Sequence, residues 1–132
     1  VQGGVDLFVV IYGGLTFVGC CVFYYLYLGL KCGCGFDTVD TVLLEALEAI
    51  RGHFETPVVI TSACRCIAHN HAVGGTDKSQ HLKGRATDIQ VKGIEPARIA
   101  NYAEDLGMSV GRYSTFTHID SRSGTPVTWG QN

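Results

Sequence analysis

The sequence predicts an α+β fold in which a small central antiparallel sheet is flanked by helices. Two segments, residues 39–50 and 95–106, place apolar side chains at helical spacing, and short apolar runs typical of strands stand between and after them. The connections are of hairpin length rather than a regular strand–helix–strand repeat, which favours α+β over a parallel α/β sheet. A chain of 132 residues is long enough for one core but not for two.

The first predicted helix follows Asp37 or Thr38, because either side chain can cap a helix N-terminus. Its apolar positions are Val39, Val42, Leu43, Ala46, Leu47 and Ile50. Residues 57–62 are predicted to form a buried strand. The polar, glycine-terminated stretch at residues 69–75 is predicted to be a loop that lines or shapes a cleft.

The second half of the chain supplies the remaining elements. Residues 86–91 are predicted to form a buried strand, and residues 95–106 a helix with Pro96 in its first turn. The core-facing positions of that helix are Ile99, Ala100 and Ala103. Strands are predicted at 109–113 and 116–121, a turn at 122–126, and a short edge strand at 127–129.

The charge of the chain argues against a nucleic-acid partner. Lys and Arg total 10, Asp and Glu total 12, and the net charge is −2. The basic residues form no run or stripe along the chain. We therefore expect no nucleic acid among its partners.

His81, Asp88 and His118 are the candidate metal ligands. Two imidazoles and one carboxylate suit Zn²⁺, and three protein ligands leave the fourth tetrahedral position open for water, as hydrolysis requires. Gly84 permits a tight turn that lets the strand at 86–91 carry Asp88 back beside His81. A single histidine is more often a surface or hydrogen-bonded residue than a ligand, so the interpretation depends on the combination.

Four strings resemble the zinc D-alanyl-D-alanine carboxypeptidase family, or M15-type peptidases. In order they are ITSACRC at 60–66, HNHAVGG at 69–75, SQHLKGRATD at 79–88 and FTHID at 116–120. The family also takes in phage endolysins, the vancomycin-resistance D,D-dipeptidases and, more distantly, the hedgehog signalling domain. The resemblance runs from about Lys31 to Trp129, which is most of the chain.

The resemblance implies a hedgehog-like and D,D-peptidase-like fold, one zinc ion and cleavage of peptide bonds in bacterial cell walls. It also implies that His81, Asp88 and His118 bind the zinc, while Arg65 and Ser79 hold a carboxylate of the substrate. A guanidinium group can bind a carboxylate with two parallel hydrogen bonds, which makes Arg65 a reasonable anchor. Tyr113 is a candidate donor to the developing oxyanion, although a tyrosine at a strand end more often only packs.

The catalytic base is a separate question. Many members of the family carry an acidic residue three positions before the last histidine, but that position here is Thr115. Asp120 lies two residues after His118 and shares its face of the predicted strand. It could be the base that takes a proton from water, or it could only orient the imidazole of His118. Both roles are open on the sequence alone.

Six cysteines need an explanation. Cys32, Cys34, Cys64 and Cys66 form two closely spaced pairs, which favours disulfides in an oxidising compartment or buried thiols. A structural zinc site with four thiolates usually has wider spacing than one intervening residue.

Residues 1–30 form a predicted apolar N-terminal segment, separate from a peptidase-like domain at 31–132. No charged residue occurs from Leu7 to Leu30, a length that suits a transmembrane anchor. Glycines and β-branched residues in this segment would also allow apolar strands that pack in an assembly. Length alone favours the anchor.

The sequence thus predicts a zinc metallopeptidase that hydrolyses the peptide stem of peptidoglycan, of the D,D-carboxypeptidase or of the endopeptidase and endolysin type. We expect it outside the cytoplasm, either anchored in the cell envelope or in a virion or extracellular assembly. The alternative is a structural subunit of a phage particle or extracellular filament that displays a peptidase-like domain without catalysis. Membrane binding or self-assembly would then involve residues 1–30.

Overall fold

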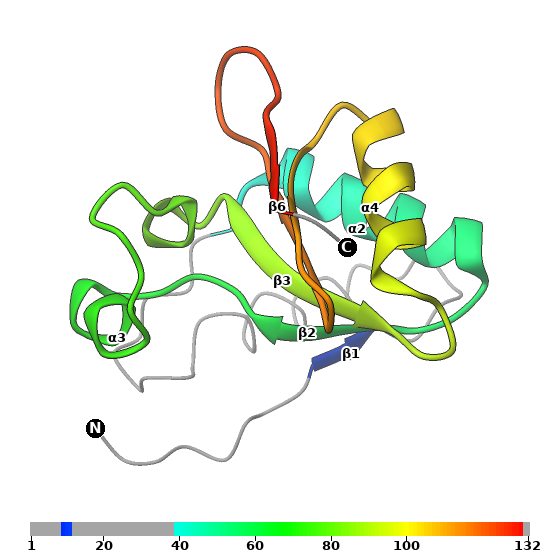
Figure 1. The fold of residues 1–132 in the computed structure, drawn as a ribbon, viewed down its shortest axis with the longest axis horizontal. Coiled ribbons are helices and arrows are strands. Elements are labelled where there is room, and N and C mark those ends of the chain that lie inside the picture. Colours follow the sequence, from blue (N-terminus) through cyan, green and yellow to red (C-terminus); the bar gives the residue numbers. More distant parts are fainter. Residues whose placement is uncertain (1–8, 12–38, 131–132) are drawn as a thin grey trace.

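A computed structural model of the chain describes residues 9–11 and 39–130, and its arrangement is shown in Figure 1. The elements, in chain order, are β1 (Val9–Ile11), α2 (Thr41–Phe54), β2 (Val58–Ser62), α3 (Ile67–Ala72), the 3-10 helix η1 (Gln80–Lys83), β3 (Ala86–Val91), α4 (Pro96–Asp105), β4 (Ser109–Arg112), β5 (Thr117–Asp120) and β6 (Thr128–Gly130).

The strands form one six-stranded sheet in the order β1-β2-β3-β5-β4-β6. Neighbouring strands are antiparallel except β4 and β6, which are parallel. Helices α2 and α4 lie together against one side of the sheet (Figure 1). The predicted α+β class with a central, largely antiparallel sheet is therefore confirmed.

The two faces of the sheet differ in chemistry because side chains alternate along each strand. On β3, Ile89 and Val91 belong to the hydrophobic core that α2 and α4 complete. Asp88 and Gln90 point to the opposite side, which we call the site face. On β5, Ile119 enters the core and His118 lies on the site face beside Asp88. The sheet thus separates an apolar layer from a polar one.

Helix α2 begins later than the sequence predicted. Its first residue is Thr41 and its N-cap residue is Asp40, while the predicted caps, Asp37 and Thr38, lie outside the described residues. The Asp40 side chain makes no capping hydrogen bond, and one of its carboxylate oxygens accepts a bond from the Ser121 hydroxyl. Of the apolar positions at helical spacing within α2, Val42 is 52% exposed and lies outside the core. The others are buried: Leu43, Ala46, Leu47 and Ile50.

Other elements agree with the prediction more closely. Helix α4 has Pro96 in its first turn and buries Ile99, Ala100 and Ala103 as predicted. β3 has the predicted bounds, and β2, β4, β5 and β6 differ from theirs by one residue at one or both ends. The predicted loop at 69–75 is wrong in part, because His69, Asn70 and His71 belong to helix α3. The backbone N–H of His69 bonds to the Cys66 thiol, 3.4 Å away, so a cysteine caps this helix.

The apolar N-terminal segment is described only at Val9–Ile11. These residues form β1, which pairs with β2 so that Val9 lies opposite Ile60. The rest of the predicted segment lies outside the described residues, so the choice between an anchor and an assembly arm stays a prediction. In the described ranges, no helix combines the length and the apolar composition that a membrane crossing needs.

The cysteine pairing also stays a prediction, since Cys32 and Cys34 lie outside the described residues.

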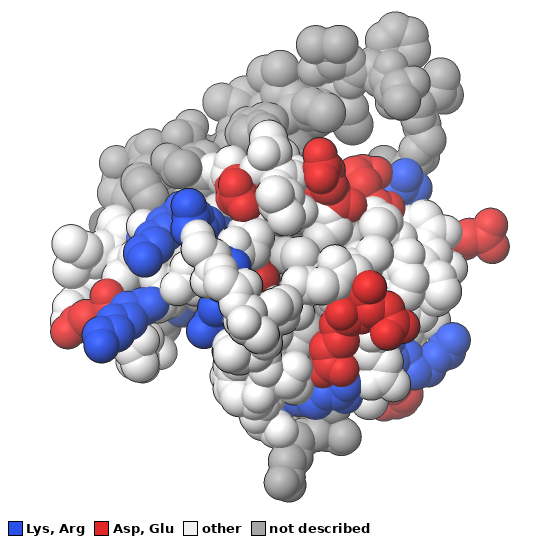
Figure 2. All heavy atoms as spheres, turned by 90° about the horizontal axis from the view of Figure 1, so that it is seen from above, with Lys and Arg blue, Asp and Glu red and all other residues white. Residues whose placement is uncertain are grey.

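Charged side chains of both signs occur among uncharged ones on the face shown in Figure 2.

The core makes a direct prediction about stability. Ile89 is 0% exposed at the centre of the sheet, so Ile89→Ala should lower the free energy of unfolding by about 2–5 kcal/mol. Ile67 on α3 is 69% exposed, and Ile67→Ala should change it by only about 0.5 kcal/mol. Urea unfolding of both variants tests this pair, and equal losses would show that the core is assigned to the wrong face.

Candidate metal centre

Three buried side chains converge on the site face. β3 and β5 are antiparallel neighbours with Asp88 opposite His118, and η1 brings His81 to the same point. The Nε2 atom of His81 lies 3.3 Å from Nδ1 of His118 and 3.4 Å from Oδ1 of Asp88. Nδ1 of His118 lies 2.8 Å from the same Asp88 oxygen. Since one donor atom from each residue lies within 4.8 Å of the others, the three predicted ligands form one cluster.

Local structure explains why His81 reaches this cluster. The Ser79 side chain accepts a hydrogen bond from the backbone N–H of His81 and caps η1. Gly84 ends η1 with a φ of 65°, a left-handed conformation that glycine adopts without a steric penalty. The carbonyl of His81 accepts a bond from the N–H of Arg65, which ties η1 to the end of β2. The short helix is therefore held at both ends.

Hydrogen bonds on the outer side of each ring fix which nitrogen faces inward. Nδ1 of His81 lies 2.6 Å from the carbonyl oxygen of Ala63, which can only accept, so this nitrogen carries the proton. Nε2 of His118 lies 3.1 Å from Oδ2 of Asp120 and donates to it in the same way. In the neutral rings the lone pairs of His81 Nε2 and His118 Nδ1 therefore point toward Asp88.

This donor set fits a metal cation. Two imidazole lone pairs and a carboxylate that face one another at close range repel unless a cation or a proton stands between them. Ligand atoms of a tetrahedral zinc site with bonds of about 2.0–2.1 Å lie about 3.3 Å apart. Two of the three separations in the cluster are 3.3 and 3.4 Å.

Electrostatics keep the carboxylate of the cluster ionised. Burial raises the pKa of Asp88, but its contacts with the imidazoles of His118 and His81 outweigh it and hold this pKa well below its usual range. Burial lowers the pKa of His118, yet the bonds to Asp120 and Asp88 outweigh it, so the pKa of His118 is raised. A metal ion at Nδ1 would replace the proton that His118 otherwise shares with Asp88, so metal affinity should fall as the pH is lowered.

Asp120 lies on the outer side of His118. It is fully buried, and one of its oxygens accepts from Nε2 of His118, the ring nitrogen remote from the cluster. Burial raises the pKa of Asp120, but hydrogen bonds from Arg122 and His118 outweigh it and lower the pKa to about 2. A carboxylate with this pKa is a poor proton acceptor near neutral pH. Position and pKa both favour the orienting role over the role of base.

Arg65 lies at the edge of the cluster, and part of its guanidinium is already engaged. Its Nη2 donates to Oδ2 of Asp88 at 3.1 Å, and its Nε donates to the Ser62 hydroxyl at 3.0 Å. Burial lowers the pKa of Arg65, while Asp88 and the nearby Tyr113 act in the opposite direction. Arg65 thus holds the carboxylate of a candidate ligand in place, and its contact with substrate stays a prediction.

Tyr113 is 39% exposed and stacks on Phe116, with ring centroids 4.4 Å apart. Its hydroxyl accepts a hydrogen bond from the indole N–H of Trp129 at 3.2 Å. This contact places the Tyr113 hydroxyl beside a residue that also contacts His118, whose ring centroid is 5.1 Å from that of Trp129. Its role as an oxyanion donor and the substrate role of Ser79 stay predictions.

Sequence reasoning missed two residues of this site. The sequence places Arg122 in a predicted turn and Trp129 in a predicted edge strand, with no role at the site for either. In the structure Arg122 bonds to Asp120, and its guanidinium carbon lies 5.1 Å from the centre of the Trp129 ring. The alternation of Asp120 with Arg122 was a usable signal, since residues two apart along an extended chain share a face.

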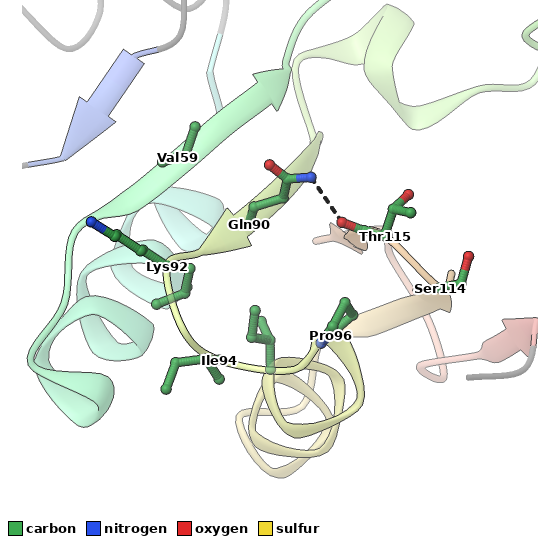
Figure 3. A pocket seen from close by; sticks show the side chains of 9 residues that line it. Val59, Gln90, Lys92, Ile94, Pro96, Ser114 and Thr115 are labelled. Atoms are coloured by element: carbon green, nitrogen blue, oxygen red, sulfur yellow. Dashed lines mark hydrogen bonds between the residues drawn. The ribbon is translucent and has the colours of Figure 1, made fainter.

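A hollow of about 460 Å³ opens farther along the site face (Figure 3). Gln90, two residues after Asp88 on β3, lies at its wall and donates a hydrogen bond to the carbonyl oxygen of Thr115 at 2.8 Å. The remaining lining residues are Val59, Val91, Lys92, Ile94, Pro96, Ile99 and Ser114. Gln90 and Asp88 are two residues apart on β3, about 7 Å along the strand, and none of the three cluster residues lines the hollow.

The chain matches a known protein family. The sequence model of a family described as Peptidase M15 matches residues 23–120, which is most of the chain. The match includes all three cluster residues and ends at Asp120, before Arg122 and Trp129. No curated protein matches the chain.

Metal content tests the cluster. His81→Ala or His118→Ala should abolish stoichiometric zinc binding, because two remaining ligands hold the ion weakly. His71 supplies the matched control, since its side chain is 61% exposed and pairs with Asp77 away from the cluster. Elemental analysis after dialysis should give one zinc per chain for wild type and His71→Ala. Full occupancy in the two cluster variants would rule the site out.

Proposed function

This chain belongs to the peptidase M15 family, and we propose on that premise that it is a zinc-dependent peptidase acting on the peptide stem of peptidoglycan. The observation that carries the proposal is the buried cluster of His81, Asp88 and His118, whose inward atoms offer two lone pairs and one ionised carboxylate. A zinc ion bound there would polarise a scissile carbonyl and acidify water.

The residues around the cluster have distinct tasks in this proposal. Ala63 and Asp120 fix the tautomers of the two histidines, so that their inward nitrogens bind metal. Arg65 holds the second oxygen of Asp88 and is close enough to the cluster to attract a carboxylate of a wall peptide. Tyr113 presents a hydroxyl near the same edge for the developing oxyanion.

Substrate would extend along the site face from the cluster toward the hollow beside Gln90 and Thr115. The mixture of apolar and polar walls there suits part of a short peptide, which carries both aliphatic groups and amides. The bond cut would be one of the stem, in the manner of a D,D-carboxypeptidase or of an endopeptidase of endolysin type.

A second candidate function has an observation in its favour. Thr115 replaces the acidic residue that many family members carry three positions before the last histidine, and Asp120 bonds to the outer nitrogen of His118, remote from the inward atoms of the cluster. A domain with an intact metal site and no positioned base would bind wall peptides, or serve as a displayed subunit, without cutting them. In either case we propose a location outside the cytoplasm, with residues 1–30 serving a membrane or an assembly.

Hydrolysis of purified peptidoglycan tests the proposal and separates the two candidates. A peptidase should release new amino termini from the wall, lose this activity with a chelator and regain it when zinc is restored. His81→Ala should be inactive and His71→Ala active. A wild-type protein that binds one zinc per chain yet releases no product would support the second candidate and contradict the first.

The role of Asp120 can be measured in the same preparation. Asp120→Asn should weaken zinc binding by about 10 to 100-fold, because an amide holds the His118 tautomer less firmly, and the zinc-saturated variant should keep most of its turnover. If Asp120 is the base, zinc affinity should persist while saturated turnover falls by about 10² to 10⁴. Zinc titration and turnover at saturating zinc distinguish the two.

A further inference from the structure

The described chain continues past the end of the family match, and this tail returns to the metal centre. Residues 121–130 include the loop after β5 and the strand β6, which pairs in parallel with β4 at the edge of the sheet. Two side chains from the tail, Arg122 and Trp129, contact the residues that surround the ligand His118.

Arg122 donates three hydrogen bonds to the carboxylate of Asp120. Its Nε donates to Oδ1 of Asp120 at 2.7 Å, its backbone N–H donates to the same oxygen at 3.1 Å, and its Nη2 donates to Oδ2. Oδ2 also accepts from Nε2 of His118. The carboxylate is fully buried, so without the guanidinium it would keep one charge and lose its countercharge.

Trp129 contacts both His118 and Arg122, the two residues that bond to Asp120. Its ring centroid lies 5.1 Å from that of His118, and the guanidinium carbon of Arg122 lies 5.1 Å from the centre of the Trp129 ring. The backbone allows this close approach because position 111 is glycine. A Cβ atom there would lie 2.8 Å from the Trp129 ring. The indole N–H also donates to the hydroxyl of Tyr113.

We propose that Arg122 and Trp129 are positioning residues for the metal centre. Arg122 fixes the carboxylate of Asp120 against Nε2 of His118, and Trp129 packs against both the imidazole and the guanidinium. Together they keep Nδ1 of His118 directed toward His81 and Asp88. This inference rests on the metal site of the proposed function, but it assigns a task to a part of the chain beyond the family match.

The physical reason is the choice between two imidazole tautomers. A neutral imidazole can carry its proton on either nitrogen, and only the Nε2–H form leaves Nδ1 able to bind a metal ion. An acceptor held firmly beside Nε2 selects that form and fixes the plane of the ring. Asp120 is such an acceptor only while its own orientation is fixed, and Arg122 supplies most of its hydrogen bonds.

The test compares two arginines that bind carboxylates in the same way. Arg112 donates from Nε and Nη2 to the two oxygens of Glu104 on α4, so it is a matched control away from the cluster. Zinc dissociation constants, measured by competition with a coloured chelator, should rise by about 10 to 100-fold in Arg122→Ala. Arg122→Lys should recover part of that loss, and Arg112→Ala should bind zinc like wild type.

Cobalt supplies a readout that a merely structural role would not change. The absorption bands of bound Co²⁺ depend on ligand geometry, so they should shift in Arg122→Ala and in Trp129→Leu, and less in Trp129→Phe. Trp129 is the only tryptophan of the chain. Because its ring lies beside His118, Co²⁺ should quench the tryptophan emission of wild type and leave that of His118→Ala unquenched.

The outcomes separate this inference from the function on which it rests. Wild-type protein that binds neither zinc nor cobalt would overturn the metal site itself, and the inference with it. The inference alone would be overturned if the wild-type protein binds both metals and all four variants match its zinc affinity and cobalt spectrum. These variants are Arg122→Lys, Arg122→Ala, Trp129→Phe and Trp129→Leu. Thermal unfolding of the metal-free variants shows that each one is folded when its affinity is measured.

Discussion

The antiparallel pairing of β3 with β5 is the constraint on which the site depends. It sets Asp88 opposite His118, so that a carboxylate and an imidazole meet on one face of the sheet while Ile89 and Ile119 enter the core on the other. A shift of one residue in this register would exchange the two faces and bury the wrong side chains. The same pairing that packs α2 and α4 therefore also assembles two of the three proposed ligands.

The cluster of His81, Asp88 and His118 is buried, so its polar atoms need partners inside the protein. Lone pairs and a negative charge that face one another away from water need a cation or a proton between them. Ala63 and Asp120 hold the outer nitrogens, Arg65 holds the outer oxygen of Asp88, and none of these contacts occupies the inward atoms. The cluster is thus organised around a common point before any ligand arrives, which lowers the cost of binding one.

Much of this could be predicted from the sequence, because short spacing and alternation decide it. The convergence of His81, Asp88 and His118, the bounds of β3 and the core side of α4 follow from local pattern. Features set by contacts distant in the sequence could not be predicted. The N-cap residue of α2 is an example, because the Asp40 carboxylate accepts a hydrogen bond from Ser121, far along the chain, and makes no capping bond to its own helix.

The same limit applies to the site. Alternation places Asp120 on the face of His118, but only the structure shows which ring nitrogen it contacts. The contact of Trp129 with His118 depends on the parallel pairing of β6 with β4 across the sheet edge, which no local pattern encodes.

A crystal structure of the zinc-loaded protein, with anomalous data at the zinc edge, tests the central claim most directly. We expect one ion bound by Nε2 of His81, a carboxylate oxygen of Asp88 and Nδ1 of His118, with Asp120 still on Nε2 of His118. An ion bound through Nε2 of His118, or held by Asp120, would contradict it.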